Sequence, residues 1–245
     1  PFCAPKKYWD MYPNVRMPDN QFRSKGLPEE VKNSGEINAY ALAKSPDDKE
    51  FMRLVKTGFY ACVSYVDQLF GQLIEALDEC GLKDNTIVVL LGDHGWSLGE
   101  HNFVGKHNLM EVATRVPLII HVPGMKPGHT SSVVELIDLY PTLCQLCDIP
   151  QPKKQLDGVS LVPILHDAKI RVKKQAYIQW EGGDDVIDWR YNYANWPKSN
   201  HKMLFDHQVD KQENHNCVIA EKYQKTRIEL QKRLKKVKKF AFRNH

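Results

Sequence analysis

The sequence has no long hydrophobic run. A membrane-spanning helix needs about 18 consecutive apolar residues, and the longest apolar stretches here, around residues 87–91 and 116–122, are far shorter. We therefore predict that the chain has no membrane span. Its 245 residues, of which 42% are hydrophobic and 26% charged, are typical of a globular protein with a sizeable core, built as one large domain or as one domain with a small appendage.

Cysteines are few and scattered. Six in 245 residues are too few for the disulfide framework of a small secreted domain. Cys144 and Cys147 have Cys-x-x-Cys spacing, but they lie in the amphipathic pattern of residues 136–149, and no second such pair or His pair is nearby. We expect two small residues on the core side of a helix, with a metal or redox site as the alternative.

Acidic residues are scarce at the C-terminal end. The net charge is +4, and much of the surplus lies in EKYQKTRIELQKRLKKVKKFAFRNH, residues 221–245. Apolar residues at near-helical spacing predict a helix, which is either solvated or a patch for a polyanion such as a sulfated glycan, nucleic acid or anionic lipid. No base-reading motif or aromatic platform accompanies the patch, so we predict no nucleic-acid partner.

A long helix is predicted before residue 81. Ser45 is the expected N-cap, Pro46 occupies the first helical position, and Asp47 and Asp48 favour the positive end of the helix. Apolar residues then recur at spacings of three and four, and Gly81 can end the helix. We expect this helix to pack along one face.

Two apolar segments, TIVVLL (86–91) and VPLIIHVPG (116–124), follow the helix. Apolar residues at successive positions indicate strands that are covered on both faces, as in a parallel sheet. Together with the helical pattern of residues 133–149, they predict an α/β fold with a doubly wound sheet.

The pattern changes after residue 166. AYIQW and MLFDH indicate strands of a smaller, largely antiparallel sheet before the basic helix. We therefore place the domain boundary between residues 1–166 and 167–245. The segment 180–196, rich in Trp and Tyr, either reads a ligand or forms a surface hairpin with ordinary aromatic packing.

Polar residues follow the first apolar strand at once. Asp93 and His94 stand where TIVVLL ends, and ligands of doubly wound sheets bind outside the carboxyl ends of the strands. The two side chains can be metal ligands, a general acid and base, or a structural pair. The long polar loop after them also holds Lys106. We predict an oxyanion site, with Asp93 holding a hard cation and Lys106 facing the anion; in the structural alternative each group is solvated or hydrogen-bonded.

The motif GDHGWSLGEH, followed by Lys106, ATRVPLIIHVPG and VELIDLYPTLCQL, resembles the second half of sulfatases of the alkaline-phosphatase superfamily, and iduronate-2-sulfatases most. The likeness extends to PFCAPKKYWDMYP and to MLFDHQVDKQENHN, so it covers most of the chain. It implies part of an alkaline-phosphatase-like doubly wound sheet with a smaller C-terminal α+β subdomain.

Hydrolysis of sulfate monoesters is the activity that this resemblance implies. In the family a formylglycine, made from Cys or Ser, attacks sulfur, while calcium and basic side chains hold the sulfate oxygens. Asp93 and His94 match two calcium-site positions, and Lys106 matches a lysine that binds sulfate. The further candidates for substrate binding are Trp96, as a sugar platform or a packing residue, and His101 and His107, as pocket-lining or satisfied loop histidines.

The implied substrate is 2-O-sulfated iduronate in glycosaminoglycans. The implied compartment is lysosomal, extracellular or periplasmic, although the sequence has no Asn-x-Ser/Thr glycosylation site. Two alternatives stay open: a phosphodiesterase or phosphatase of the same superfamily, and a sulfatase-like protein that binds glycans without catalysis.

The sequence departs from the family pattern at its start. Cys3 is followed by Ala, Pro and Lys, and the chain contains no Cys-x-Pro-x-Arg or Ser-x-Pro-x-Arg motif for formylglycine. The family's paired N-terminal Asp residues and the His before the PF opening have no counterpart. We therefore expect an N-terminal half elsewhere in a longer or processed protein to carry the nucleophile, and we expect these 245 residues to be inactive alone.

Overall fold

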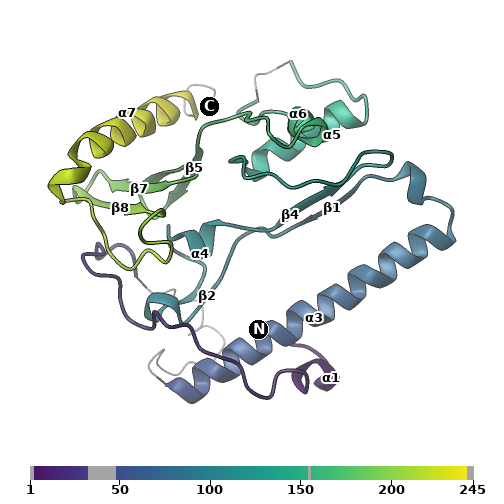
Figure 1. The fold of residues 1–245 in the computed structure, drawn as a ribbon, viewed down its shortest axis with the longest axis horizontal. Helices are drawn as coiled ribbons and strands as arrows, with labels where there is room; N and C mark the ends of the chain where they lie inside the picture. The colour runs from purple at the N-terminus through teal and green to yellow at the C-terminus, as the bar shows by residue number, and fades with distance from the viewer. Residues whose placement is uncertain (1–2, 33–47, 154–155, 242–245) are drawn as a thin grey trace. The chain divides into compact units, whose positions relative to one another are not determined.

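The computed structural model describes residues 3–32, 48–153 and 156–241 and is a mixture of helices and sheets (Figure 1). The α-helices and strands, in chain order, are α1 (Lys6–Trp9), α3 (Lys49–Glu79), β1 (Val88–Leu91), β2 (Ser97–Leu98), β3 (Val104–Gly105), α4 (Glu111–Thr114), β4 (Leu118–His121), α5 (Leu139–Leu146), α6 (Val162–His166), β5 (Ala176–Trp180), β6 (Gly183–Ile187), β7 (Tyr191–Trp196), β8 (His201–Asp206) and α7 (Gln224–Ala241). Within the described ranges, no helix is both long and apolar enough to cross a membrane.

The chain divides into two compact units. The first comprises Pro1–Arg23, Lys32–Asn108 and Val112–Gly124, and the second comprises Ser24–Val31, Leu109–Glu111 and Met125–His245. The boundary predicted after residue 166 falls inside the second unit and stays a prediction.

The helix α3 begins with a side-chain cap. Asp48 is the N-cap, and its Oδ1 accepts a hydrogen bond from the Phe51 amide at 2.9 Å, which satisfies a backbone donor that the first turn of a helix leaves free. The predicted cap residues Ser45, Pro46 and Asp47 lie outside the described residues. In the first half of the helix Phe51 and Met52 are buried against Val104 of β3.

Several apolar side chains of α3 are exposed to solvent. The helix ends as predicted at Gly81, which has φ +67°, and the Leu82 amide donates to the Leu77 carbonyl at 3.0 Å. The predicted packing along one face is seen at Phe51 and Met52 and again at Tyr65, whose ring lies 5.1 Å from that of Tyr8 in α1. The exposed apolar side chains of α3 are Leu54, Val63, Val66, Leu69 and Leu73.

The strands β1 and β4 pair antiparallel, with Val88 opposite His121 and Leu91 opposite Leu118. The prediction of a parallel arrangement is therefore wrong for this pair. Parallel neighbours need a long crossover, usually a helix, whereas the segment between these strands has α4, of four residues, as its one α-helix, beside the short strands β2 and β3. Leu91 is 41% and Ile119 58% exposed, so the described residues do not cover both faces.

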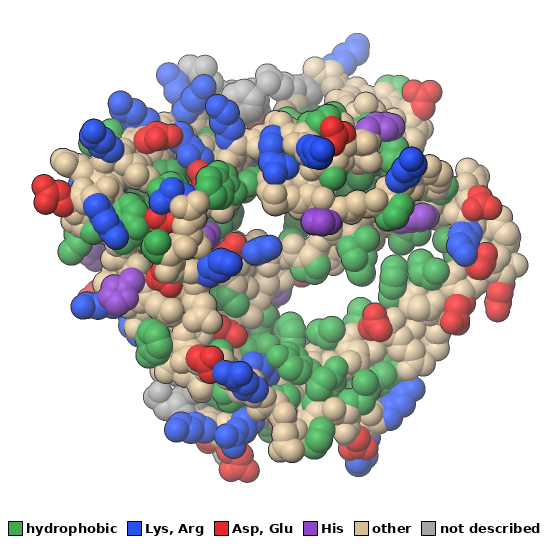
Figure 2. Space-filling model, in the orientation of Figure 1, with side chains coloured by type: hydrophobic (Ala, Val, Ile, Leu, Met, Phe, Trp, Pro, Cys, Tyr) green, Lys and Arg blue, Asp and Glu red, His purple; other side chains and the backbone are tan. Residues whose placement is uncertain are grey.

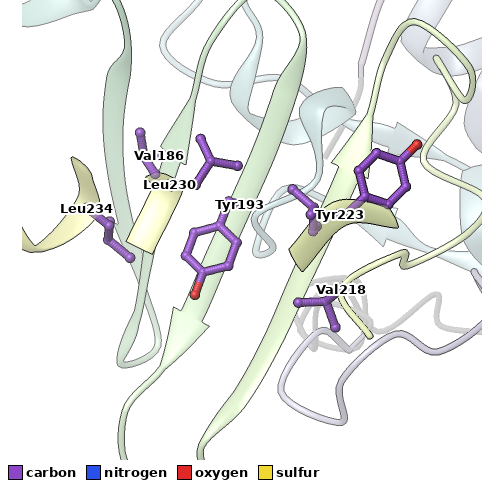
Figure 3. Packing of buried hydrophobic residues seen from close by; sticks show 7 residues of the cluster. Val186, Tyr193, Val218, Tyr223, Leu230 and Leu234 are labelled. Atoms are coloured by element: carbon purple, nitrogen blue, oxygen red, sulfur yellow. The ribbon is translucent and has the colours of Figure 1, made fainter. Parts of the chain in front are cut away.

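The second unit contains the predicted antiparallel sheet, in the order β5-β6-β7-β8. AYIQW forms β5, and most of MLFDH lies in β8. The helix α7 packs on one face of this sheet, where Leu230 and Leu234 meet Val186, Tyr193 and other buried residues (Figure 3). The Trp- and Tyr-rich segment is the hairpin of β6 and β7, and its buried aromatic side chains favour the packing interpretation.

Ion pairs fix α7 to the sheet. Arg233 Nη1 lies 2.8 Å from Asp188 Oδ2, and Lys238 Nζ lies 2.5 Å from Asp184 Oδ2. Asp184 and Asp188 are nearly buried. The helix therefore has two cations with a structural role, apart from its exposed lysines.

The predicted helix around the Cys-x-x-Cys pair is α5. Cys144 is buried, as expected for a core residue, but Cys147 is exposed, so its predicted place in the core is wrong. The reason is that α5 ends at Leu146 and Cys147 is already its C-cap. Both thiols are free.

A nearly buried lysine links α5 to the segment before β5. Lys173 Nζ lies 2.6 Å from Glu135 Oε2 and 2.7 Å from Asp138 Oδ1, and Asp138 is fully buried. Because removal of Lys173 leaves a buried carboxylate without its cation, we expect Lys173→Met to lower the free energy of unfolding by about 3 kcal/mol. Denaturant unfolding measures the loss.

The matched control is Lys6→Met, since Lys6 pairs with Asp10 at 2.5 Å on the surface, where the side chains are 84% and 58% exposed. We expect little change there. Equal losses in the two variants would contradict a special role for the Lys173 pair.

Candidate functional site

The loop that follows β1 is held against the start of β4. The Gly92 amide donates to the Pro117 carbonyl at 3.1 Å, and the Gly95 amide donates to the Ala113 carbonyl at 2.9 Å. A Cβ atom at Gly95 would lie 2.1 Å from the Val112 carbonyl oxygen, so only glycine permits this close approach. These contacts fix the part of the loop that contains Asp93 and His94.

A short hairpin brings Trp96 and Lys106 together. Ser97 of β2 pairs with Gly105 of β3, so the residues just outside this pair, Trp96 and Lys106, become neighbours across the hairpin. Lys106 Nζ lies 5.5 Å from the centroid of the Trp96 ring, which is the geometry of a cation–π contact. Lys106 is half-buried, and this contact holds its ammonium beside the indole.

Asp93 and His94 present two donor atoms side by side. His94 Nδ1 lies 2.9 Å from the Gly95 carbonyl, and because a carbonyl only accepts, Nδ1 carries the proton in this contact. In the neutral ring Nε2 then has the lone pair, and it lies 3.3 Å from Asp93 Oδ2. A backbone hydrogen bond that fixes the tautomer in this way is typical of metal-binding histidines.

The indole of Trp96 connects the two parts of the site. Its ring centroid lies 6.1 Å from that of His94, and the same indole contacts Lys106. The structure thus gathers four predicted residues: Asp93, His94, Trp96 and Lys106. Asp93 is 82% exposed, so its carboxylate is accessible to a ligand.

The two loop histidines lie in different environments. His101 is 3% exposed, its Nε2 lies 3.3 Å from Asn20 Nδ2, and its ring packs 6.4 Å from that of Phe103. This burial favours the satisfied-histidine interpretation for His101. His107 is half-buried, two positions after Gly105. The assignment of either histidine to substrate stays a prediction.

Sequence reasoning did not identify Asn20. Its carbonyl accepts a hydrogen bond from the His101 amide at 2.9 Å, in addition to the side-chain contact. His101 has φ +56°, a left-handed conformation that is uncommon for a residue other than glycine. Asn20 lies in an irregular segment far away in sequence, so no spacing signal could have found it.

The close approach at Gly95 gives a testable prediction. We expect Gly95→Ala to destabilise the protein by about 1–3 kcal/mol, because the loop must move to admit a methyl group. Thermal unfolding checks this result.

Gly71→Ala is the control, because a Cβ at Gly71 meets nothing within 4 Å and lies within α3. That variant should gain about 0.5–1 kcal/mol from the higher helix propensity of alanine. A neutral Gly95→Ala variant would mean that the loop is not held in this position.

Two family models match the chain. The model described as Sulfatase matches residues 4–149, and the model described as N-sulphoglucosamine sulphohydrolase, C-terminal, matches residues 99–240. The first match includes Asp93, His94, Trp96 and Lys106. Each match covers more than half of the chain.

The chain is also similar to curated sulfatases. It is 31% identical to iduronate 2-sulfatase of Homo sapiens over 191 residues, which are 63% of this chain and 35% of that protein. It is 28% identical to an arylsulfatase of Clostridium perfringens over 239 residues, which are 94% of this chain and 49% of that protein. The chain therefore spans between a third and a half of the length of these relatives.

Solved structures confirm the predicted fold class. The chain matches BT4656, solved in complex with D-glucosamine-2-N,6-O-disulfate, with a TM-score of 0.82 and 19% identity over 97% of this chain and 62% of that chain. It matches BT1596, described as a 2-O GAG sulfatase, with a TM-score of 0.72 and 27% identity over 92% of this chain and 53% of that chain. The fold is the alkaline-phosphatase-like α/β fold of sulfatases, and the chain belongs to the sulfatase family.

Proposed function

We propose that the protein hydrolyses sulfate monoesters and that the end of β1 supplies part of its active site. The convergence of Asp93, His94 and Lys106 around Trp96 carries this proposal. A sulfate ester has its negative charge on peripheral oxygens, so a site that places a cation and metal-binding donors close together can hold it. Such fixed charges stabilise the transition state because they need no reorganisation during the reaction.

Lys106 has the role of binding the sulfate oxygens. Lys106 is half-buried, and its ammonium lies 5.5 Å from the centroid of the Trp96 ring, which positions it. Partial burial strengthens its attraction for an anion relative to the same charge in water. The Trp96 ring, which is itself half-buried, offers an apolar surface to the group that carries the sulfate.

Asp93 and His94 fit part of a calcium site. Asp93 offers an exposed carboxylate, the ligand type that calcium prefers. The hydrogen bond from His94 Nδ1 to the Gly95 carbonyl leaves the lone pair on Nε2, which lies 3.3 Å from this carboxylate. Calcium takes about six to eight ligands, and the described residues contain no group of three or more His, Cys, Asp or Glu side chains that could hold a metal. The two residues would therefore hold the ion together with ligands from outside the described residues. When bound, calcium would supply positive charge to the sulfate oxygens.

The nucleophile must come from elsewhere in the protein. The chain has no Cys-x-Pro-x-Arg or Ser-x-Pro-x-Arg motif, and it spans 35% of the length of human iduronate 2-sulfatase. We propose that the remaining part carries the formylglycine and the other calcium ligands, and that the chain is inactive without it. The exposed apolar residues of α3, and Leu91 and Ile119 of the β1–β4 pair, support a covering partner of this kind.

For the substrate we propose a 2-O-sulfated uronic acid in a glycosaminoglycan. The names of human iduronate 2-sulfatase and of BT1596, a 2-O GAG sulfatase, support this choice. The competing substrate is an aryl sulfate, because another relative is an arylsulfatase. A glycosaminoglycan substrate in turn favours a lysosomal, extracellular or periplasmic location.

The test is sulfate release by the full-length protein from three substrates: a 2-O-sulfated iduronate disaccharide, a 6-O-sulfated glucosamine and an aryl sulfate. We expect preference for the first, and loss of activity when calcium is chelated. A phenyl phosphonate monoester is the fourth substrate, because hydrolysis of it in preference to every sulfate ester would overturn the sulfatase assignment. Preference for the aryl sulfate would overturn only the choice of sugar.

A further inference from the structure

A groove of about 720 Å³ lies on the second unit. It is lined by the segment at Gly26, by the turn between β7 and β8, and by the start of α7, and none of its lining residues belongs to the candidate site at the end of β1. Two cations, Lys202 and Arg227, and one carboxylate, Glu29, line it. Within the described part of the chain neither cation forms an ion pair: Lys202 Nζ donates to Asn200 Oδ1 at 2.8 Å, and Arg227 donates to the Val218 carbonyl.

A row of lysines continues from this groove along α7. Lys225, Lys232, Lys236 and Lys239 are separated by seven, four and three residues, which places them on one face of a helix. All four are exposed, and among the described residues none of them forms an ion pair. They extend over about 21 Å at a rise of 1.5 Å per residue. Figure 2 shows the blue Lys and Arg side chains gathered over α7.

The lysines of this row do not anchor α7 to its sheet. The opposite face of α7 is anchored by Leu230 and Leu234, which are 1% and 4% exposed, and by the ion pairs of Arg233 and Lys238 with the sheet. The row and the groove are continuous, because Ile228 lines the groove and Lys232 follows it one helical turn later. One surface therefore combines a cavity with an extended line of positive charge.

The chemistry of this surface favours a sulfated polysaccharide over other polyanions. Nucleic-acid surfaces usually add aromatic side chains on which bases stack, and among the described residues no Phe, Tyr or Trp lines the groove. Helices that lie on membranes insert a broad apolar face, whereas Leu230 and Leu234 of α7 are buried against its own sheet. The amide of Gln231, which lines the groove, suits the hydroxyl groups of a sugar.

We propose that the groove and the lysine row form a second binding surface for a sulfated polysaccharide, which holds the polymer while one of its sulfate esters is hydrolysed elsewhere. The statement that a sulfate ester of the polymer is hydrolysed rests on the proposed sulfatase function, whereas the statement that the surface binds the polymer does not. Because the attraction is electrostatic and releases counterions, binding weakens steeply with salt.

The test compares two variants of the full-length protein with equal net charge. The first replaces Lys225, Lys232, Lys236 and Lys239 by Gln, and the control replaces Lys126, Lys169, Lys174 and Lys211, which are exposed lysines of the same unit, by Gln. We expect the first variant to bind heparin at least about tenfold more weakly than the wild type, with a shallower salt dependence, and the control to stay within about threefold. Equal weakening in both would overturn the proposal, since it would reflect net charge alone.

Two further measurements separate this surface from other partners and from the catalytic proposal. Tighter binding of single-stranded RNA, or of phosphatidylserine vesicles, than of heparin at the same salt concentration would overturn the choice of polysaccharide. In the sulfatase assay, the four-lysine variant should raise KM for a polymeric substrate and leave turnover of a sulfated disaccharide unchanged. A protein that binds heparin through the row but hydrolyses no ester would disprove the sulfatase function and leave the binding surface intact.

Discussion

Replacement of Lys106 by alanine should reduce sulfate ester hydrolysis by the full-length protein about 10²–10³-fold in kcat/KM, the loss that follows removal of one positioned charge-stabilising group. Lys106 is half-buried and its ammonium lies 5.5 Å from the centroid of the Trp96 ring, so a water molecule cannot replace both its charge and its position. Steady-state kinetics on the preferred sulfated saccharide measures the effect. Lys106→Arg should recover only part of the activity, because the planar guanidinium does not reproduce the position of the ammonium.

The control for Lys106 must distinguish chemistry from folding. Lys126→Ala removes an exposed lysine and should leave kcat/KM unchanged. Lys106→Ala should also keep the calcium-dependent rise in Tm, because Lys106 is not a metal ligand, whereas Asp93→Asn should reduce that rise. Full activity in Lys106→Ala would refute the sulfate-binding role, and an unchanged calcium response in Asp93→Asn would refute the metal-binding role.

The strand-end site could be predicted in part because its signal is local. Asp93 and His94 interrupt an apolar strand within two residues, and buried strands seldom end in this way without a reason. The contact between Trp96 and Lys106 could not be predicted, since it depends on the Ser97–Gly105 register of a hairpin with two-residue strands. Strands this short show no alternation that a sequence pattern could reveal.

The fold was predictable where periodicity runs over many residues. The long helix and its end at Gly81 followed from regular apolar spacing and from the left-handed conformation that glycine permits. The direction of β4 relative to β1 did not follow, because a run of apolar residues indicates burial and carries no information about strand direction. The antiparallel order depends on how the segment between them folds back, through the hydrogen bonds of Gly92 and Gly95.

The free energy of unfolding should fall as the pH rises above about 4, and Asp185 should cause much of this dependence. Asp185 lies on β6 and is fully buried; among the described residues neither of its oxygens has a hydrogen-bond partner of normal geometry. Burial and the nearby Glu213 carboxylate raise the pKa of Asp185 well above its usual value, although the Val186 amide opposes the shift. A raised pKa in the folded state favours the protonated form, so the stabilisation is complete below the unfolded pKa of about 3.9 and is lost as the pH rises through the folded pKa.

Neighbouring groups allow the contribution of Asp185 to be separated. Burial lowers the pKa of His207, but its hydrogen bond to Glu213 at 3.0 Å outweighs this effect and the net pKa is raised, so His207 also loses stabilisation as the pH rises, at pH values above about 6.5. The pKa of Asp206 is lowered, chiefly by its hydrogen bonds from Arg190; its stabilisation is present above about pH 3.9 and is lost only in stronger acid. Among these three groups, Asp185 is the one that loses stabilisation with rising pH between its unfolded pKa of about 3.9 and about pH 6.5, so the slope there comes mainly from Asp185.

Asp185→Asn tests this assignment, because the amide has nearly the same shape and cannot ionise. Urea unfolding at a series of pH values should give a flatter profile for the variant than for the wild type below about pH 6.5. Above the folded pKa of Asp185 the variant should be more stable than the wild type, which then has an ionised carboxylate in its core. The control is Asp184→Asn, which should lose stability throughout this range because Asp184 pairs with Lys238 at 2.5 Å. A wild-type profile that rises with pH, or an Asp185→Asn profile as steep as that of the wild type, would contradict the assignment.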